Sequence, residues 1–331
     1  MSEQNHRILF VDRGEVELES CPIPSPAAGQ LLIQTQVSLI SPGTERAWFL
    51  GLPNTPATYP QTAGYSNIGQ VVQVGAGVDG WSAGDRVASA ANHVAFAAVD
   101  AATCVPVPAG LPAEEAVFFN LASIAMQGVR KARVELGEPV VVIGGGLIGL
   151  MAVQLARLSG AVPAIVVDKN PGRLEFAELA GADAALVADQ QLEDRVASLC
   201  GGDGAAVVIE ATGFPNAILS AFALARPGGR VVLLGSTRGE TEQVNFYRDV
   251  HKKGLAILGA HDMTRPRVDS APGWWTQRDD QRTALALLAA RRLAVQPLIT
   301  HRFGWRDAVA AYELLKQWDL NALGMVLNWQ P

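Results

Sequence analysis

A glycine-rich loop constrains the fold of this chain more than any other feature of its sequence. The loop has the spacing G-x-G-x-x-G at Gly144, Gly146 and Gly149, between an apolar run at residues 140–143 and an apolar stretch at residues 147–158. The first glycine allows a tight turn, the second lets the backbone approach a pyrophosphate, and the third permits close packing of a helix on a strand. The pattern predicts a buried strand, a phosphate-binding turn and a helix.

An acidic residue supports this interpretation. Asp168 ends the next apolar run, residues 164–167, at about the 20-residue separation that is typical of a ribose-binding carboxylate. A carboxylate accepts hydrogen bonds from the ribose 2′-OH and repels a 2′-phosphate, which favours NAD over NADP. The positive charges of Lys169 and Arg173 could tolerate a phosphate. We therefore predict NAD as the cofactor and keep NADP as the alternative.

The rest of the chain divides into two kinds of pattern. After residue 140, strand-like runs such as 206–209 and 230–234 alternate with helical stretches, which predicts a parallel sheet with both faces covered. The first hundred residues are short strand-like runs separated by Gly and Pro, which is typical of a compact β-rich domain. Near the end, residues 325–329 read as a strand that packs back onto that domain. We expect an α/β protein of two domains.

Composition excludes several classes of function. Lys+Arg number 26 and Asp+Glu 32, a net charge of -6, whereas a general nucleic-acid surface needs an excess of cations. The three cysteines are scattered without a C-x-x-C pair, so they form neither a disulfide framework nor a cysteine-built zinc lobe. The polar first ten residues lack a signal-peptide core, and three consecutive glycines, a glutamine and an arginine interrupt the longest apolar stretch, residues 139–158. We expect a cytoplasmic protein without a nucleic-acid or membrane partner.

Several short motifs resemble the medium-chain dehydrogenase/reductase superfamily, which includes the zinc alcohol and polyol dehydrogenases and their zinc-free relatives. The motifs are Pro-Gly-Thr-Glu at 42–45, Gly-Tyr-Ser-Asn-Ile-Gly at 64–69, Gly-Asp-Arg-Val at 84–87, the glycine-rich loop, Ala-Thr-Gly at 211–213 and Pro-Gly-Gly-Arg at 227–230. The resemblance covers nearly the whole chain. It implies a GroES-like catalytic domain at residues 1–115 and 276–331 and a Rossmann doubly wound parallel-sheet cofactor domain at residues 116–275. The segment Ser-Pro-Gly-Thr-Glu at 41–45 is also loosely similar to that of bacteriochlorophyllide dehydrogenase-like proteins and of dehydrogenases of secondary metabolism.

The departures from the family pattern concern the metal. The resemblance places the zinc-ligand cysteine on Pro42, the ligand histidine on Tyr65 and the third ligand on Phe119. Proline and phenylalanine cannot bind zinc, and tyrosine is a poor replacement for histidine. With these departures, the resemblance implies an enzyme without catalytic zinc.

Without a metal, hydride transfer still needs a proton donor or acceptor near the substrate oxygen. The resemblance suggests five candidates: Thr44 at the hydroxyl-relay position, Tyr65 with its phenol in the vacated metal space, His93 lining the substrate pocket, and Asn120 and Ser123 near the nicotinamide. Each has a structural alternative. Tyr65 could fill a void, Thr44 could bond the local backbone and His93 could be a core histidine. Asn120 and Ser123 could cap a helix.

The candidate cofactor residues lie in the phosphate loop, around Asp168, or at the carboxyl ends of later strands, where ligands bind in parallel sheets. They are Gly144, Gly146, Leu147, Ile148, Gly149, Asp168, Lys169, Arg173, Ala211, Thr212, Gly213, Leu234, Gly235, Ser236 and His261. We expect the substrate in the crevice between the two domains.

Three functions remain open. The first is an NAD-dependent, zinc-independent oxidoreductase that interconverts a secondary alcohol and a ketone. The polar pocket candidates suit a hydroxylated small molecule such as a sugar, a cyclitol or a natural-product intermediate. The second is an NAD(P)H-dependent enone or quinone reductase, against which Asp168 argues. The third is a catalytically silent dinucleotide-sensing protein. The resemblance also implies a homodimer or a homotetramer.

Overall fold

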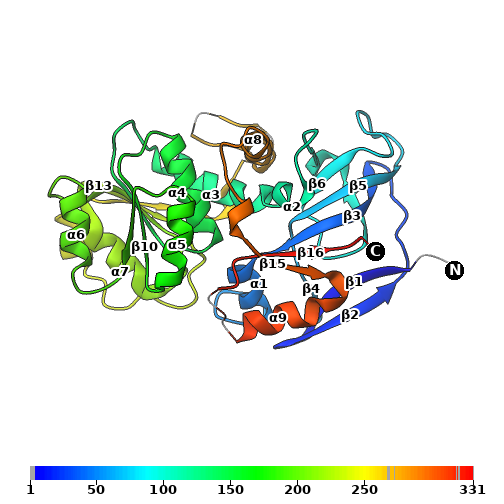
Figure 1. Ribbon diagram of the computed structural model, residues 1–331, viewed down its shortest axis with the longest axis horizontal. Coiled ribbons are helices and arrows are strands. Elements are labelled where there is room, and N and C mark those ends of the chain that lie inside the picture. The colour runs from blue at the N-terminus through cyan, green and yellow to red at the C-terminus, as the bar shows by residue number, and fades with distance from the viewer. Residues whose placement is uncertain (1–3, 267–268, 272, 318, 320, 331) are drawn as a thin grey trace. The chain divides into compact units, whose positions relative to one another are not determined.

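The computed structural model describes residues 4–266, 269–271, 273–317, 319 and 321–330 (Figure 1). The chain divides into two compact units. Unit 1 comprises Met1–Leu121, Gln281–Arg291 and Leu298–Pro331, and unit 2 comprises Ala122–Asp280 and Arg292–Pro297. The division falls inside α3 (Phe119–Ala132) and inside α8 (Gln277–Ala289), a few residues beyond the limits that we predicted at 115 and 276. Residues Arg292–Pro297, which we predicted in the catalytic domain, belong to unit 2.

Unit 1 is built mainly from antiparallel strands. A three-stranded sheet has the order β2-β1-β4, and a larger sheet has the order β15-β16-β3-β5-β6-β8, with β7 also paired to β3. The strands are β1 (Asn5–Asp12), β2 (Glu15–Cys21), β3 (Gln30–Ile40), β4 (Gln61–Thr62), β5 (Asn67–Val74), β6 (Arg86–Ser89), β7 (Phe96–Asp100), β8 (Val105–Pro106), β15 (Ile299–Gly304) and β16 (Gly324–Asn328). The predicted return of the C-terminal strand is confirmed, because β16 pairs with β3 in the register Met325↔Ile40.

Helices α1 (Pro42–Phe49), α2 (Ala113–Ala116) and α9 (Ala308–Lys316) lie wholly in unit 1, and most of α8 belongs to it as well. Helix α1 starts directly after β3, where Pro42 occupies its first turn and has no N–H to satisfy. Its buried face packs into an aromatic core in which Phe10, Phe49 and Tyr312 are fully buried. The ring centroids of Phe10 and Tyr312 are 5.0 Å apart in an edge-on arrangement. This core holds α1 firmly between β1 and α9.

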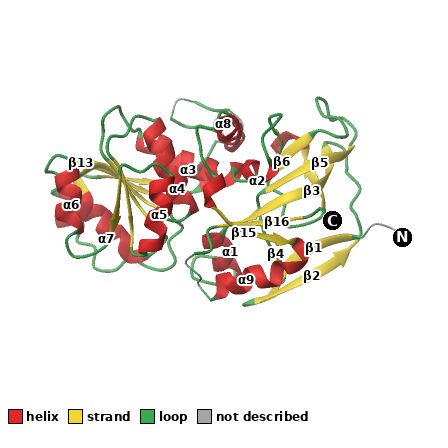
Figure 2. Ribbon diagram, viewed as in Figure 1, coloured by secondary structure: helices red, strands yellow, loops and turns green. Residues whose placement is uncertain are grey.

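Unit 2 is a parallel sheet with the strand order β11-β10-β9-β12-β13-β14. Its strands are β9 (Val140–Ile143), β10 (Ala164–Asp168), β11 (Ala184–Val187), β12 (Ala205–Glu210), β13 (Ala225–Leu233) and β14 (Ala256–Gly259), and its helices are α4 (Leu147–Leu158), α5 (Pro171–Leu179), α6 (Leu192–Leu199) and α7 (Pro215–Leu224). Figure 2 shows α4 and α5 on one side of the sheet and α6 and α7 on the other. The strand order reverses between β9 and β12, and ligands bind at such a switch point.

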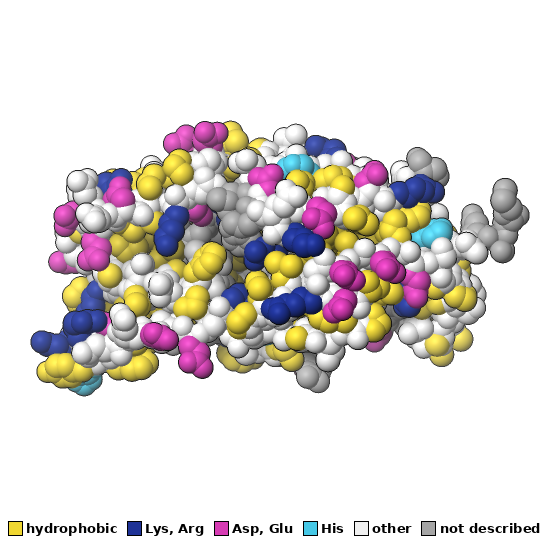
Figure 3. All heavy atoms as spheres, turned by 90° about the horizontal axis from the view of Figure 1, so that it is seen from below, with side chains coloured by type: hydrophobic (Ala, Val, Ile, Leu, Met, Phe, Trp, Pro, Cys, Tyr) yellow, Lys and Arg dark blue, Asp and Glu magenta, His cyan; other side chains and the backbone are white. Residues whose placement is uncertain are grey.

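The surface agrees with the charge balance of the sequence. On the face drawn in Figure 3, cationic and acidic side chains are interspersed and do not form one broad basic field. Among the described residues, no helix is both long and apolar enough to cross a bilayer.

Candidate active site

The phosphate loop at the end of β9 needs its glycines. Gly144 has φ +113°, and a Cβ atom there would lie 2.9 Å from Cγ2 of Thr212. A Cβ atom on Gly149 would lie 1.8 Å from the carbonyl oxygen of Gly144. The loop after β12 therefore packs against the phosphate loop, and α4 approaches it as closely as backbone atoms allow. Both contacts are those expected of a dinucleotide-binding turn.

The N-terminus of α4 is open to an anion. Gly146 is the N-cap residue, and no described side chain caps the helix there. The first N–H groups of the helix, beginning at Leu147 and Ile148, are therefore available to a phosphate group, and the helix dipole favours negative charge at this end.

Asp168 lies at the end of β10 and faces this loop. Its Oδ2 accepts a 2.6 Å hydrogen bond from the N–H of Gly145, and its Oδ1 accepts one of 2.7 Å from Asn170. A Cβ atom on Gly146 would lie 3.7 Å from Nη1 of Arg173, whereas Lys169 is exposed. Burial lowers the pKa of Arg173, and the Asp168 carboxylate opposes that shift. A carboxylate and a guanidinium thus stand together where a ribose would bind.

The ends of β12 and β13 meet beside the phosphate loop. A Cβ atom on Gly213 would lie 2.6 Å from the carbonyl oxygen of Ser236, and one on Gly235 would lie 2.5 Å from the N of Gly213. The segments 211–213 and 234–236 are therefore in direct contact. The structure brings together the phosphate loop, Asp168 and both strand ends, all within unit 2.

Sequence reasoning missed Glu210, which ends β12 and is fully buried. Its Oε1 accepts hydrogen bonds from the N–H of Thr212 at 2.6 Å, from the Thr212 hydroxyl and from the N–H of Gly213 at 3.2 Å. Burial raises the pKa of Glu210, and these hydrogen bonds oppose the shift. Glu210 shapes the turn that packs on Gly144. The sequence did contain a signal for this residue, because an acidic residue ends an apolar run directly before the Ala-Thr-Gly motif.

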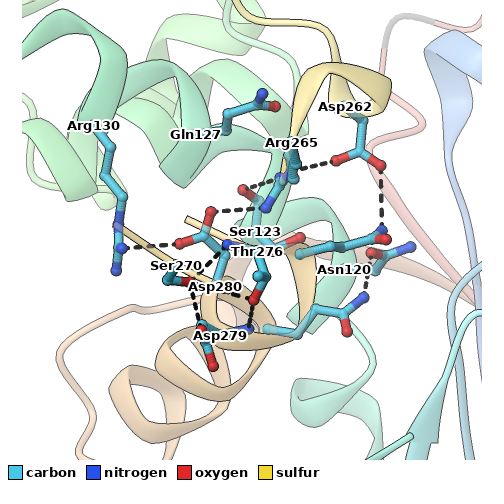
Figure 4. Close-up of polar contacts among 12 residues, drawn as sticks. Asn120, Ser123, Gln127, Arg130, Asp262, Arg265, Ser270, Thr276, Asp279 and Asp280 are labelled. Carbon is cyan, nitrogen blue, oxygen red and sulfur yellow. Dashed lines mark hydrogen bonds and ion pairs between the residues drawn. The ribbon is translucent and has the colours of Figure 1, made fainter. Parts of the chain in front are cut away.

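Two further candidates have local partners in unit 2. His261 is exposed, and its Nδ1 accepts a 3.2 Å hydrogen bond from the N–H of Met263, so its ring caps a short helix. Ser123 is fully buried, and its carbonyl oxygen accepts a 2.7 Å hydrogen bond from Arg265 (Figure 4). In this structure the ring of His261 serves the local backbone, and Ser123 anchors a buried arginine.

In unit 1, Tyr65 forms a hydroxyl pair with Ser41. The phenol oxygen lies 2.6 Å from Oγ of Ser41. Ser41 is the N-cap residue of α1, where a serine hydroxyl ordinarily accepts a hydrogen bond from the first turn of the helix. Here the side chain makes no such bond. The hydroxyl of Ser41 therefore serves Tyr65 instead of the helix.

Neighbouring groups orient Tyr65. Asn120 donates a 2.7 Å hydrogen bond from Nδ2 to the carbonyl oxygen of Tyr65 and accepts one of 3.0 Å from Gln281, so both ends of its buried amide are engaged. The ring of Trp48 lies 5.6 Å from the ring of Tyr65. Thr44 is half-buried in the first turn of α1. The structure thus gathers Ser41, Thr44, Tyr65 and Asn120 in one region of unit 1.

His93 has a different setting from the pocket lining that we predicted. Its side chain is fully buried, with Nδ1 2.8 Å from Oγ of Ser38 and Nε2 3.0 Å from Oε2 of Glu45. Both ring nitrogens are therefore engaged inside unit 1. Glu45 is also fully buried, as a hydrogen-bond partner of this histidine.

The residues at the zinc-ligand positions do not fit zinc. Pro42 and Phe119 offer no donor atom, Phe119 is fully buried, and the hydroxyl of Tyr65 is hydrogen-bonded to Ser41. Zinc sites in proteins are built from thiolate, imidazole and carboxylate groups. Among the described residues, no group of three His, Cys, Asp or Glu side chains is placed to hold a metal ion.

Comparison with known proteins agrees with this fold. The family model described as "Alcohol dehydrogenase GroES-like domain" matches residues 27–142, and the one described as "Zinc-binding dehydrogenase" matches residues 148–271. D-guloside 3-dehydrogenase of Shigella flexneri is 31% identical over 70% of this chain and 67% of its own length. The chain belongs to the medium-chain dehydrogenase/reductase superfamily.

Other members of the superfamily match over the full length. Sorbitol dehydrogenase of Gallus gallus is 27% identical over 95% of this chain and 94% of its own. A protein from Sinorhizobium meliloti 1021, solved bound to NADP, has a TM-score of 0.81 at 23% identity and covers 99% of this chain and 100% of its own. Membership in this superfamily identifies the protein as an oxidoreductase. The second family model is named for zinc binding, whereas the side chains of Pro42, Tyr65 and Phe119 do not suit a zinc ion.

Proposed function

We propose that the protein is a zinc-independent, NAD-dependent dehydrogenase that interconverts a secondary alcohol and a ketone on a hydroxylated small molecule. Tyr65 is the proton donor and acceptor in this proposal. The observation that carries it is the 2.6 Å pair of Tyr65 and Ser41, which involves the residue that the resemblance aligns with a zinc-ligand histidine.

The position of the pair suits acid–base chemistry. Ser41 stands at the N-terminus of α1, where the helix dipole favours a negative charge. In the structure the phenol of Tyr65 donates to Oγ of Ser41. When Tyr65 is ionised, the Ser41 hydroxyl would instead donate to the phenolate oxygen and stabilise it in the same way. Because Ser41 makes no capping bond to α1, its hydroxyl can fill this role.

The proposed reaction balances as follows. In alcohol oxidation, Tyr65 in its phenolate form takes the hydroxyl proton of the substrate, and the carbinol carbon gives up a hydride. A nicotinamide held by the cofactor residues of unit 2 would supply the acceptor for that hydride. In ketone reduction, Tyr65 returns the proton to the carbonyl oxygen. Asn120 keeps the backbone of Tyr65 in place through its bond to the carbonyl oxygen of that residue.

Asp168 supports the choice of NAD. Its carboxylate stands at the end of β10, on the Gly145 N–H, where it would accept the ribose hydroxyls and repel a 2′-phosphate. Arg173 lies in the same region, but its positive charge interacts with the Asp168 carboxylate. The phosphate loop and the N-terminus of α4 would hold the pyrophosphate.

Polar groups around Tyr65 support a hydroxylated substrate. Thr44 is a hydroxyl residue in the first turn of α1, three positions after Ser41, and the indole of Trp48 supplies an apolar ring surface next to Tyr65. Sugars combine hydroxyls with apolar C–H faces, which match these two kinds of surface. The names of two relatives, sorbitol dehydrogenase and D-guloside 3-dehydrogenase, denote polyol or sugar substrates.

Replacement of Tyr65 tests the proposal. Tyr65→Phe removes only the phenol oxygen, and we expect kcat for alcohol oxidation to fall on the order of 10²-fold. NADH affinity should stay the same, because the cofactor residues belong to unit 2. Tyr59→Phe is the matched control, since it removes a phenol that bonds the carbonyl of Trp48 at 2.8 Å in the same unit. Full activity of Tyr65→Phe would refute the role of Tyr65.

Two binding measurements test the rest of the proposal. Fluorescence titration of the purified protein should give tighter binding of NADH than of NADPH. Preference for NADPH would favour an enone reductase, and binding of neither would favour a silent protein. Metal analysis should find less than stoichiometric zinc, and one tightly bound zinc per chain would refute the zinc-independent reaction.

A further inference from the structure

A buried polar network in unit 1 centres on His93. It joins Ser38 of β3, Glu45 of α1, Tyr312 of α9 and Trp329, which follows β16. Trp329 donates a 2.8 Å hydrogen bond from Nε1 to Oγ of Ser38, and the same Oγ lies 2.8 Å from Nδ1 of His93. His93 then donates from Nε2 to Glu45. Each of these side chains has a hydrogen-bond partner within the network, and all of them are buried.

On one side, this network holds Ser41. Oε1 of Glu45 accepts a 2.7 Å hydrogen bond from the backbone N–H of Ser41, and the N–H of Glu45 donates to the carbonyl of Ser41 at 2.9 Å. Oε2 of Glu45 accepts from His93 and from the hydroxyl of Tyr312. The Glu45 carboxylate is therefore fixed by three donors, and it fixes the residue whose hydroxyl meets Tyr65.

On the other side, the same histidine touches the backbone before Tyr65. Gly64 has φ +84°, and a Cβ atom there would lie 2.5 Å from Cγ of His93, so the imidazole packs directly on this glycine. The N–H of His93 donates to the carbonyl of Ala63 at 2.7 Å, and Asn92 donates to the carbonyl of Gly64 at 2.7 Å. Residues 92 and 93 thus clamp the two residues that lead into Tyr65.

We propose that His93 is a positioning residue that sets the Tyr65–Ser41 pair from both sides, through Glu45 on Ser41 and through Gly64 on Tyr65. His93 itself touches no substrate in this proposal. Its catalytic consequence rests on the proposed function of Tyr65, whereas its structural consequence does not. A displacement of about 1 Å in such a pair can cost up to 10²-fold in rate.

The experiment uses two readouts on His93→Gln. The chain has four tyrosines, so incorporation of 3-fluorotyrosine gives four ¹⁹F resonances, and Tyr65→Phe assigns that of Tyr65. Glutamine keeps a donor for Glu45 but removes the ring that packs on Gly64. We expect the Tyr65 resonance to move, and kcat to fall by about tenfold or more with KM nearly unchanged.

Two other variants keep the proposal open to refutation. Val87→Ala removes packing from a separate core cluster of unit 1 that contains none of the network residues, so it should leave the Tyr65 resonance and kcat in place. If His93→Gln does not fold, Ser38→Ala frees the imidazole at Nδ1 and should move the Tyr65 resonance in the same direction by less.

The outcomes separate the two proposals. An unmoved Tyr65 resonance in His93→Gln or Ser38→Ala overturns the positioning role, whatever Tyr65→Phe does to activity. A moved resonance together with a fully active Tyr65→Phe supports positioning and refutes Tyr65 as the donor. Equal losses of kcat in His93→Gln and Val87→Ala would mean that His93 acts only through stability, which also overturns the role.

Discussion

Arg265 holds a buried charge cluster together in unit 2, and its removal should have a large cost. Its side chain is 3% exposed and forms 2.7 Å contacts from Nη1 to Oδ2 of Asp280, from Nε to Oδ1 of Asp262 and from Nη2 to the carbonyl of Ser123 (Figure 4). Arg130 completes the cluster, with Nη1 3.2 Å from Oδ1 of Asp280 and its guanidinium 3.9 Å from the ring centroid of Trp275. Two positive and two negative charges thus balance.

The expected loss of stability depends on the partners that Asp280 keeps in the Arg265→Met variant. Asp280 is 1% exposed and would keep only Arg130 as a cationic partner. Removing one partner of a buried ion pair costs about 3–5 kcal/mol, because the other charge stays buried. Since Arg130 remains, we expect a loss of about 3 kcal/mol in the free energy of unfolding. The double variant Arg265→Met/Asp280→Leu should recover most of this loss, because replacing both charges with apolar groups is often neutral.

Urea unfolding of the two single variants and the double variant gives the coupling energy. The matched control is Arg302→Met, which breaks a 2.8 Å pair with Glu114 whose side chains are 47% and 29% exposed. Exposed pairs contribute about 0–1 kcal/mol, so this control should be nearly neutral. If Arg265→Met costs no more than Arg302→Met, the reasoning from burial is wrong.

Three further outcomes are expected. Burial raises the pKa of Asp280 from 3.8 to about 6, so the folded state holds the proton more tightly than the unfolded chain does. This group should therefore remove about 3 kcal/mol of stability as pH rises from about 4 to 6, and Asp280→Asn should flatten the pH dependence of urea unfolding in that window. Gly149→Ala would place a Cβ atom 1.8 Å from the Gly144 carbonyl and push the phosphate loop from α4. A fluorescence titration should show NADH affinity at least about tenfold weaker, and an unchanged Kd would contradict the predicted loop contact. Asp168→Ser should lower the ratio of NADH to NADPH affinity by about tenfold or more, and an unchanged ratio would assign the ribose to another residue.

The dinucleotide-binding half could be predicted largely from the sequence. The apolar runs, the glycine spacing and Asp168 are local signals, and the helix that we expected at residues 147–158 is α4 (Leu147–Leu158). A buried parallel strand is apolar almost throughout, and a phosphate turn needs glycine for steric reasons. These requirements concern residues that are consecutive in the chain, so they can be recognised from the local sequence.

The setting of the polar residues in unit 1 was decided by the tertiary structure. Tyr65 meets Ser41 across 24 positions, His93 meets Glu45 across 48, and Tyr312 meets the same carboxylate across 267. Nothing in the neighbouring sequence distinguishes a histidine that lines a pocket from one that closes a buried network. That choice depends on which donors and acceptors the packed sheets bring within about 3 Å, because a buried polar group is stable only when it is paired. The residue types were therefore readable from the sequence, while their roles were set by distant partners.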